Sequence, residues 1–258
     1  VHLKIHTEYS LVDGIVRIED LMPKARAMQM PAIALSDHNN IFALVKFYKA
    51  ALGAGLKPLL GADVWLASAT EQEAPSALTL FCLNNQGYQN LSILLSKGWL
   101  EGQRNDQVLL QRAWLAEYSE HLLVLNGGKA GRLGQLHFAN RDEKSIQHEI
   151  DFFKQYFPDR FYLEVQRIGH PQDESYNHAA IQWAQEYDLP LVATHNVRFI
   201  EAEDFEAHEA RVCIRQSTTL DDPRRAKNYT PDQYLKSPAE MAALFADLPE
   251  ALANTVEI

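Results

Sequence analysis

The chain is poor in cysteine and has no long apolar run. Only Cys82 and Cys213 occur in 258 residues, one in an apolar stretch and one in a helical pattern, so we expect two reduced core thiols and no disulfide framework. No segment approaches the roughly 18 consecutive apolar residues that a membrane helix requires, and no signal peptide begins the chain. These absences predict a cytoplasmic protein that does not span a membrane.

Basic residues are also few. The chain has 24 Lys and Arg against 34 Asp and Glu, which gives a net charge of -10. A domain whose main task is to hold a phosphate backbone is normally basic or carries a basic stripe. The short group at 221–227, which contains two arginines and a lysine, does not amount to such a surface. We therefore expect no strong direct binding of nucleic acid.

What the chain does contain is an alternation of strand-like and helical patterns. Strand-like runs cover residues 1–6, 31–36, 57–66, 77–83, 121–126, 160–166 and 189–196. Segments with helical apolar spacing lie at 15–29, 41–52, 88–97, 107–118, 142–156, 174–187 and 203–215, and a last one starts at 238. Seven strands mostly separated by helices predict an α/β fold, a parallel barrel close to the eight-stranded βα type.

The stretch from Pro31 to Tyr48 contains polar residues at a position in this fold where a functional site could form. Its first half is an apolar run that ends at Asp37 and His38, and its second half changes to helical spacing. A carboxylate and an imidazole therefore stand on a strand-to-helix turn, at the carboxyl edge of a parallel sheet, where sites are usually built. The plainer alternative stays open: an aspartate that caps the helix, beside a surface histidine.

Other polar residues also lie in the predicted strands, most of them at the ends. Together with that turn they are His6, Asp37, His38, Asp63, Asn126, Gln166, His195 and Asn196. In a barrel the strand ends converge on one mouth, and histidines with carboxylates are ligands for Mn²⁺, Fe²⁺ or Zn²⁺. A glycine-rich loop at 127–134 invites a phosphate-binding interpretation, but it lacks the spacing and the Lys-Ser/Thr ending of a P-loop.

Several motifs carry a resemblance to one family. They lie at 2–14, 35–38, 54–63, 85–91, 161–166, 190–194, 207–208 and 219–223, so they run through nearly the whole chain. The chain resembles the polymerase-and-histidinol-phosphatase (PHP) family, and most closely the PHP domains that begin bacterial DNA polymerase III alpha subunits. The resemblance implies a distorted TIM-like (βα)7 barrel of the PHP type.

The resemblance also implies a domain plan. Residues 1–258 would form a single PHP domain, with the barrel at about 1–215 and a C-terminal extension at 216–258 that leads toward the polymerase palm. The chain has no initiator Met and ends in a helical pattern without a cap, so we expect a longer polypeptide. The implied partners are the remainder of the alpha chain and the separate proofreading exonuclease (epsilon) subunit.

Active members of the family hold up to three divalent metals at the barrel mouth and use them to hydrolyse phosphoesters. This sequence keeps part of the implied ligand set. Asp37 and His38 stand as the family has them, His6 remains from a His-x-His pair, and Asp63 occupies a position that is usually Glu.

The other ligand positions are changed. The first histidine of the pair is Lys4, a histidine expected before Gly169 is Ile168, and an Asp-x-His pair has become Asn196 and Arg198. Lys4 and Arg198 bring two fixed positive charges, which we expect to repel divalent cations and to pair with Asp37 and Asp63, or to hold a phosphate or sulfate.

These changes predict a vestigial pocket without catalytic residues, a cofactor or a full metal cluster. It would comprise Lys4, His6, Asp37, His38, Asp63, Ile168, His195, Asn196 and Arg198. One alternative is a single adventitious divalent ion, with ligands drawn from His6, Asp37, His38, Asp63 and His195. The other is that these histidines simply hydrogen-bond to neighbouring carboxylates.

Two functions remain in competition. The resemblance favours a non-catalytic domain of a DNA-directed DNA polymerase, which stabilises the polymerase subunit and docks the proofreading subunit. The alternative is an active metal-dependent 3'-5' exonuclease, pyrophosphatase or phosphoesterase. A stand-alone phosphatase related to histidinol phosphatase fits less well, because the motifs resemble those of replicative polymerases.

Overall fold

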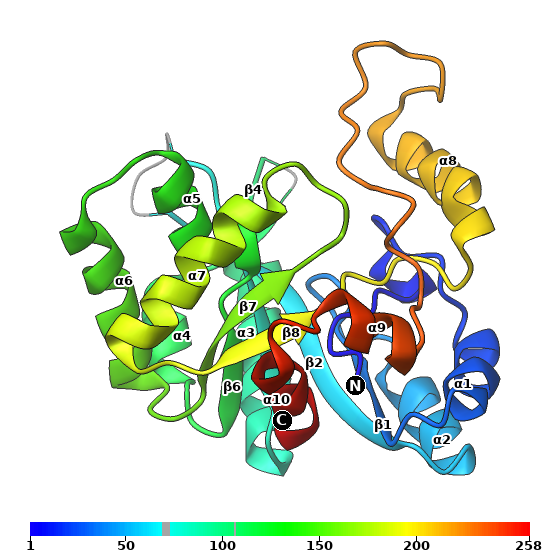
Figure 1. Cartoon of the computed structure of the whole chain (residues 1–258), viewed down its shortest axis with the longest axis horizontal. Coiled ribbons are helices and arrows are strands. Elements are labelled where there is room, and N and C mark those ends of the chain that lie inside the picture. Colours follow the sequence, from blue (N-terminus) through cyan, green and yellow to red (C-terminus); the bar gives the residue numbers. More distant parts are fainter. Residues whose placement is uncertain (69–72, 106) are drawn as a thin grey trace.

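The computed structural model describes residues 1–68, 73–105 and 107–258 and shows an α/β fold, as predicted (Figure 1). The strands are β1 (Ala32–Leu35), β2 (Lys57–Leu66), β3 (Ser76–Cys82), β4 (Gln103–Arg104), β5 (Gln107–Leu110), β6 (Leu122–Leu125), β7 (Phe161–Gln166) and β8 (Leu191–Thr194). The helices are α1 (Ile18–Ala27), α2 (Leu44–Gly53), α3 (Asn85–Glu101), α4 (Arg112–Glu117), α5 (Arg132–Phe138), α6 (Glu143–Tyr156), α7 (Asp173–Tyr187), α8 (Phe205–Gln216), α9 (Pro238–Leu244) and α10 (Pro249–Glu257). Three short 3-10 helices, η1 (Glu8–Ser10), η2 (Gly128–Ala130) and η3 (Ala202–Asp204), complete the set.

The strands form one parallel-rich sheet. Its order is β4-β5-β2-β3-β6-β7-β8, and β1 pairs with β2 off this path. Strand β3 departs from the expected parallel order, because it runs antiparallel to both β2 and β6. Only nine residues join Leu66 to Ser76, which is too short for the crossover that two adjacent parallel strands require.

The segment predicted as the first strand joins the two sides of the sheet. On one side the Ala34 N–H donates to the His2 carbonyl at 3.2 Å, and the Ser36 N–H donates to that of Ile5 at 3.2 Å. On the other side the His6 N–H donates to the carbonyl of Val197, just after β8, at 3.0 Å. Residues 2–6 therefore lie between β1 and the end of β8, although the named strands do not form a closed ladder.

Apolar side chains of this chain form the cores on which the site rests. The largest cluster packs helices α3 to α7 against β2, β3, β6 and β7, and includes Leu80, Leu94 and Phe153. A second cluster packs α1 and α2 against β1 and includes Ile33 and Phe47. Both faces of β1 and β6 are buried. One face packs against helices, and the other packs inside the barrel, where Ala34, Leu123 and Leu125 contact side chains of other strands.

Two local predictions were wrong. Residues 107–118 are not one helix: Gln107–Leu110 is strand β5, and only Arg112–Glu117 is helical. The run Val108-Leu109-Leu110 is buried beside β2 and α3, so burial on both sides favours the strand over the helical pattern. The segment 127–134 is not a simple loop, because it contains η2 and the start of α5.

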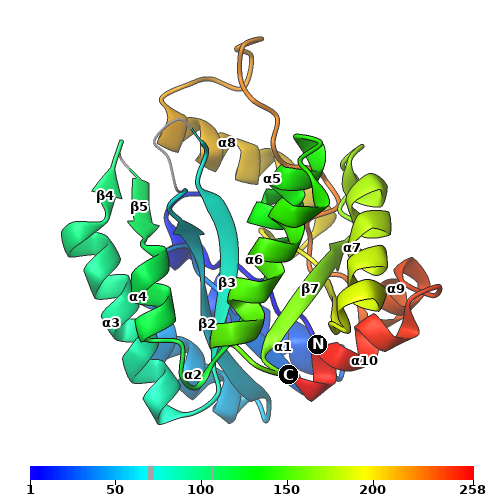
Figure 2. The ribbon, with the colours of Figure 1, turned by 90° about the vertical axis from the view of Figure 1, so that its left-hand side faces the viewer.

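The C-terminal part returns to the barrel. Helix α8 and the loop after it stand at one end of the molecule, and α9 and α10 then bring the chain back beside β8 (Figures 1 and 2). The N-terminal amine donates to the Thr255 hydroxyl at 3.0 Å, so the two termini lie close together. Cys82 and Cys213 are both free thiols. In the part of the chain that the structure describes, no helix is long and apolar enough to cross a membrane.

Candidate functional site at the barrel mouth

A cavity of about 200 Å³ lies where the carboxyl ends of the strands converge. Six of the nine residues predicted for the pocket line it: Lys4, His6, His38, Asp63, Asn196 and Arg198. Asp37, Ile168 and His195 do not line it. The pairs at 37–38 and 195–196 are each split in this way, because neighbouring residues of an extended chain point to opposite faces.

Asp63 is held by three groups at once. Its Oδ2 lies 3.5 Å from the Lys4 ammonium and 2.9 Å from Nε2 of His6. Its Oδ1 accepts a hydrogen bond from the hydroxyl of Thr79, the residue opposite it in the antiparallel β2–β3 pair. Burial alone would raise the pKa of Asp63, but Lys4 and His6 hold that pKa well below its usual range.

Lys4 also pairs with a second buried carboxylate. Its ammonium lies 3.5 Å from Oε1 of Glu164, whose side chain is fully buried in β7. The same oxygen accepts hydrogen bonds from the hydroxyl of Thr194 at 2.7 Å and from the amide of Gln166 at 3.2 Å. One lysine therefore stands between the carboxylates of two different strands.

A second ion pair lies beside the first. Arg198 Nε is 2.8 Å from Oδ2 of Asp13, and the Tyr229 hydroxyl donates to that oxygen at 3.3 Å. His6 Nδ1 lies 2.6 Å from Oδ1 of Asp13, so His6 bridges two carboxylates. Burial and the Arg198 charge act to lower the pKa of His6, but Asp13 and Asp63 together raise it above its ordinary value.

The predicted ion pair of Asp37 with Lys4 or Arg198 was wrong. Both Asp37 oxygens face Thr7, whose backbone N–H donates at 2.6 Å and whose hydroxyl donates at 2.8 Å. Burial raises the pKa of Asp37 to about 6. Asp37 thus orders the turn after the first segment and does not neutralise a pocket cation.

The remaining candidates are not gathered into one ligand set. His195 contacts the Asp232 carbonyl at 2.6 Å through Nε2, its ring lies 6.0 Å from that of His2, and burial lowers its pKa to about 3. Burial likewise lowers the pKa of His38 to about 4. Ile168 is a buried apolar side chain. Among the described residues, no group of three or more His, Cys, Asp or Glu side chains is arranged to hold a metal ion.

Four ionisable residues of the site were missed from the sequence. They are Asp13, Lys129, Glu164 and Tyr229. Glu164 could have been found, because a carboxylate inside an apolar strand must be paired when it is buried. Asp13 and Tyr229 carry no comparable signal: they meet only because residues 216–236 fold back over the mouth.

The mouth as a whole is balanced in charge. Lys4, Arg198 and a protonated His6 face the three carboxylates of Asp13, Asp63 and Glu164, and Lys129, which also lines the cavity, pairs with Asp173 at 2.8 Å. A buried charge is tolerated when it is paired with an opposite charge, as each of these is. The arrangement is therefore a closed network of ion pairs.

Fold and pocket together define an α/β domain with a polar site at the strand ends. The family model of the PHP domain matches residues 2–168, and the chain belongs to that family. Proteins named DNA polymerase III subunit alpha are similar over all 258 residues, with 52% identity for the one from Pseudomonas aeruginosa and 46% for the one from Escherichia coli K12. The chain spans 22% of the length of each.

A distant likeness to a solved structure accompanies these matches. An amidohydrolase from Chromobacterium violaceum, with bound sulfate and no metal, is 13% identical and superposes with a TM-score of 0.49. The match covers 81% of this chain and 96% of that one.

Proposed function

We propose that this chain is the N-terminal PHP domain of a bacterial DNA polymerase III alpha subunit, and that it serves the polymerase as a structural domain without hydrolytic activity of its own. Identities of 46% to 52% over the whole chain support the first part. The second part, the absence of hydrolytic activity, rests on the position of the Lys4 ammonium between Asp63 and Glu164.

A metal cluster would need carboxylates that are free to bind it. Here Asp63 is shared by Lys4, His6 and Thr79, and Asp13 by His6 and Arg198. A divalent cation would have to displace a buried ammonium, and it would leave that ammonium unpaired in a low-dielectric site. The donors present therefore do not fit the family's metal cluster.

The same balance argues against a tightly bound anion. A phosphate or sulfate in the mouth would need an excess of positive charge, but four cations, Lys129 included, already pair with four carboxylates. The network instead ties the first segment to β2, β7 and the residues after β8, so we assign it a stabilising role.

The competing function is a metal-dependent 3'-5' exonuclease, pyrophosphatase or phosphoesterase. It is favoured by one observation, that His6, His38 and Asp63 line the same cavity. Metal analysis of the purified chain, combined with hydrolysis assays in Mn²⁺ and Zn²⁺, separates the two functions. We expect substoichiometric metal and no hydrolysis that depends on Asp37. Stoichiometric metal together with an activity that vanishes in Asp37→Ala would overturn the proposal.

A further inference from the structure

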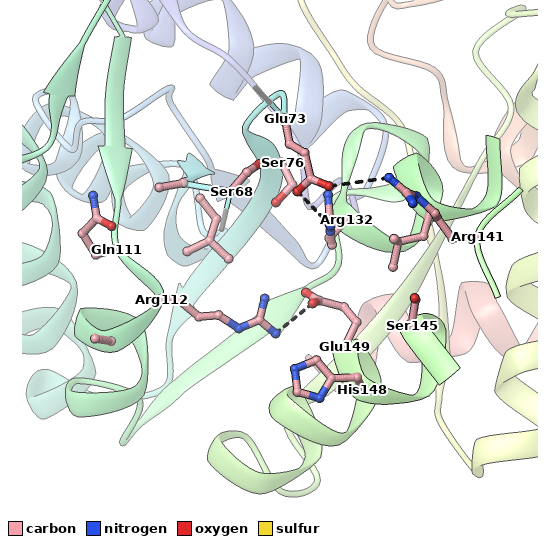
Figure 3. A pocket seen from close by; sticks show the side chains of 14 residues that line it. Ser68, Glu73, Ser76, Gln111, Arg112, Arg132, Arg141, Ser145, His148 and Glu149 are labelled. Carbon is pink, nitrogen blue, oxygen red and sulfur yellow. Dashed lines mark ion pairs between the residues drawn. The ribbon is translucent and has the colours of Figure 1, made fainter. Parts of the chain in front are cut away.

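A second cavity of about 570 Å³ lies away from the barrel mouth and shares none of its lining residues. It is bounded by the end of β2, the start of β3, the β5–α4 junction, α5 and α6 (Figure 3). A volume in this range suits a small molecule better than a length of polypeptide.

The floor of this cavity carries an unsatisfied carboxylate. The side chain of Glu149 is only 5% exposed, and its Oε2 lies 2.8 Å from Nη2 of Arg112. Its other oxygen, Oε1, is buried and has no hydrogen-bond partner among the described residues. Leaving such an oxygen without a donor is costly, so an unpaired one in a cavity wall indicates that a bound group supplies the donor.

Arg112 is held in place for such a site. Its guanidinium lies over the ring of Phe152, 3.8 Å from the ring centre, while Nη2 lies 2.8 Å from Oε2 of Glu149 without hydrogen-bond geometry. A guanidinium clamped between an aromatic face and a carboxylate loses little further freedom when a ligand arrives. The floor is therefore preorganised.

The rim is positively charged. Arg132 and Arg141 lie on either side of Glu73, at 3.1 Å and 3.9 Å from its carboxylate, and they face the Arg112–Glu149 pair across the cavity (Figure 3). The side chain of Arg141 is 59% exposed and pairs only loosely with Glu73, so it is free to turn toward a ligand. Among the described residues that line the cavity, three arginines face two glutamates, which gives local positive charge in a chain whose net charge is -10.

We infer that this cavity binds a small phosphate ester that also carries a hydroxyl or amino donor. The phosphate lies against Arg132 and Arg141, because its three acceptor oxygens satisfy several guanidinium groups where a carboxylate offers two. The hydroxyl or amino group donates to Oε1 of Glu149. The Glu149 charge disfavours a ligand that is anionic at both ends. Sugar phosphates and nucleotides both carry a phosphate ester together with a hydroxyl or amino donor.

Titration calorimetry of the chain with four probes tests this inference. The probes are inorganic phosphate, ribose 5-phosphate, adenosine 5'-monophosphate and adenosine. We expect both esters to bind at least about tenfold more tightly than inorganic phosphate, which corresponds to one added charge-assisted hydrogen bond, and adenosine not to bind. Equal affinity of the two esters identifies a sugar phosphate, and tighter binding of the monophosphate identifies a nucleotide. If neither ester binds more tightly than inorganic phosphate, the inference fails.

Variants locate the binding in this cavity. Arg132→Gln and Arg141→Gln should each weaken ester binding about tenfold, whereas Arg215→Gln on the exposed side of α8 should leave it unchanged. Glu149→Gln should remove the preference for an ester over inorganic phosphate. Because Glu149 is buried, thermal melts first establish that this variant folds; the two rim variants decide the question if it does not. Unchanged ester affinity in the Arg132→Gln, Arg141→Gln double variant would place the site elsewhere.

Discussion

At the scale of single residues, Lys4 decides the chemistry of the barrel mouth. Its ammonium is 3.5 Å from both Asp63 and Glu164, and its side chain is only 5% exposed. In water such a pair would contribute little, but removing a buried ammonium that lies between two carboxylates would leave Glu164 without a cation and Asp63 with His6 alone. Lys4, which stands where the family resemblance implies a metal ligand, is thus a structural residue.

Replacing Lys4 tests this dual role. We expect Lys4→Met to lower the free energy of unfolding by about 3 to 5 kcal/mol, because Glu164 would then be buried without a cation and Asp63 would keep only His6. Adding Glu164→Gln to Lys4→Met should recover part of the loss. Lys57→Met at the exposed start of β2 is the matched control and should change stability by less than about 0.5 kcal/mol. Urea unfolding measures all three. A Lys4→Met chain as stable as the control would show that the ion pairs contribute nothing.

At the scale of elements, helix α9 begins with a reciprocal cap that anchors the returning C-terminal segment. Glu240 accepts hydrogen bonds from the Ser237 N–H at 2.7 Å and from the Tyr234 hydroxyl at 2.6 Å, and the Ser237 hydroxyl accepts one from the Glu240 N–H at 3.3 Å. The hydrogen bond from Tyr234, followed by those from Ser237, lowers the pKa of Glu240 to about 2.

This cap predicts a pH dependence with a definite sign. The folded-state pKa of Glu240 is depressed, so its contribution is fully present above the ordinary value of 4.5 and is lost as pH falls toward about 2. Glu240→Gln should lower the free energy of unfolding by about 1 kcal/mol at pH 7, the usual value of a helix cap. Urea unfolding at successive pH values from 7 downward should show the gap between wild type and variant closing below pH 4.5. A gap that widens on acidification would contradict the assignment.

At the scale of the whole molecule, the chain is an acidic domain that covers 22% of its relatives' length. Its net charge of -10 disfavours a direct grip on DNA. The family resemblance implies the proofreading exonuclease subunit as a protein partner instead.

Binding to that subunit is measurable with the purified chain. We expect the chain to bind the proofreading exonuclease subunit in titration calorimetry, and Lys4 or Asp37 variants that remain folded to bind equally well, because neither side chain is exposed. The full alpha polypeptide is the positive control. Binding by the full polypeptide but not by the purified chain would remove the docking role and leave the stabilising one.

Much of the architecture could be predicted from the sequence. Apolar runs that end in polar residues correctly predicted β1, β2, β3, β6, β7 and β8, whereas the predicted first strand forms only isolated bridges. Strands β4 and β5 were missed; a short apolar run such as Val108–Leu110 fits a helix or a strand until its neighbours are known.

The sequence by itself indicated that Lys4, His6, Asp63 and Arg198 reach the mouth, among positions where the family resemblance implies ligands, but Asp13 and Glu164 were missed. Only the tertiary structure decided how they pair: Lys4 with Asp63 and Glu164, and Arg198 with Asp13 in place of Asp37. It also decided that Asn196 lines the mouth and that His195 does not. Ion pairs form over a few ångströms between residues that are far apart in the chain. A shift of one residue along a strand moves each side chain to the opposite face of the sheet. Strand register therefore decides which of the charged residues can pair.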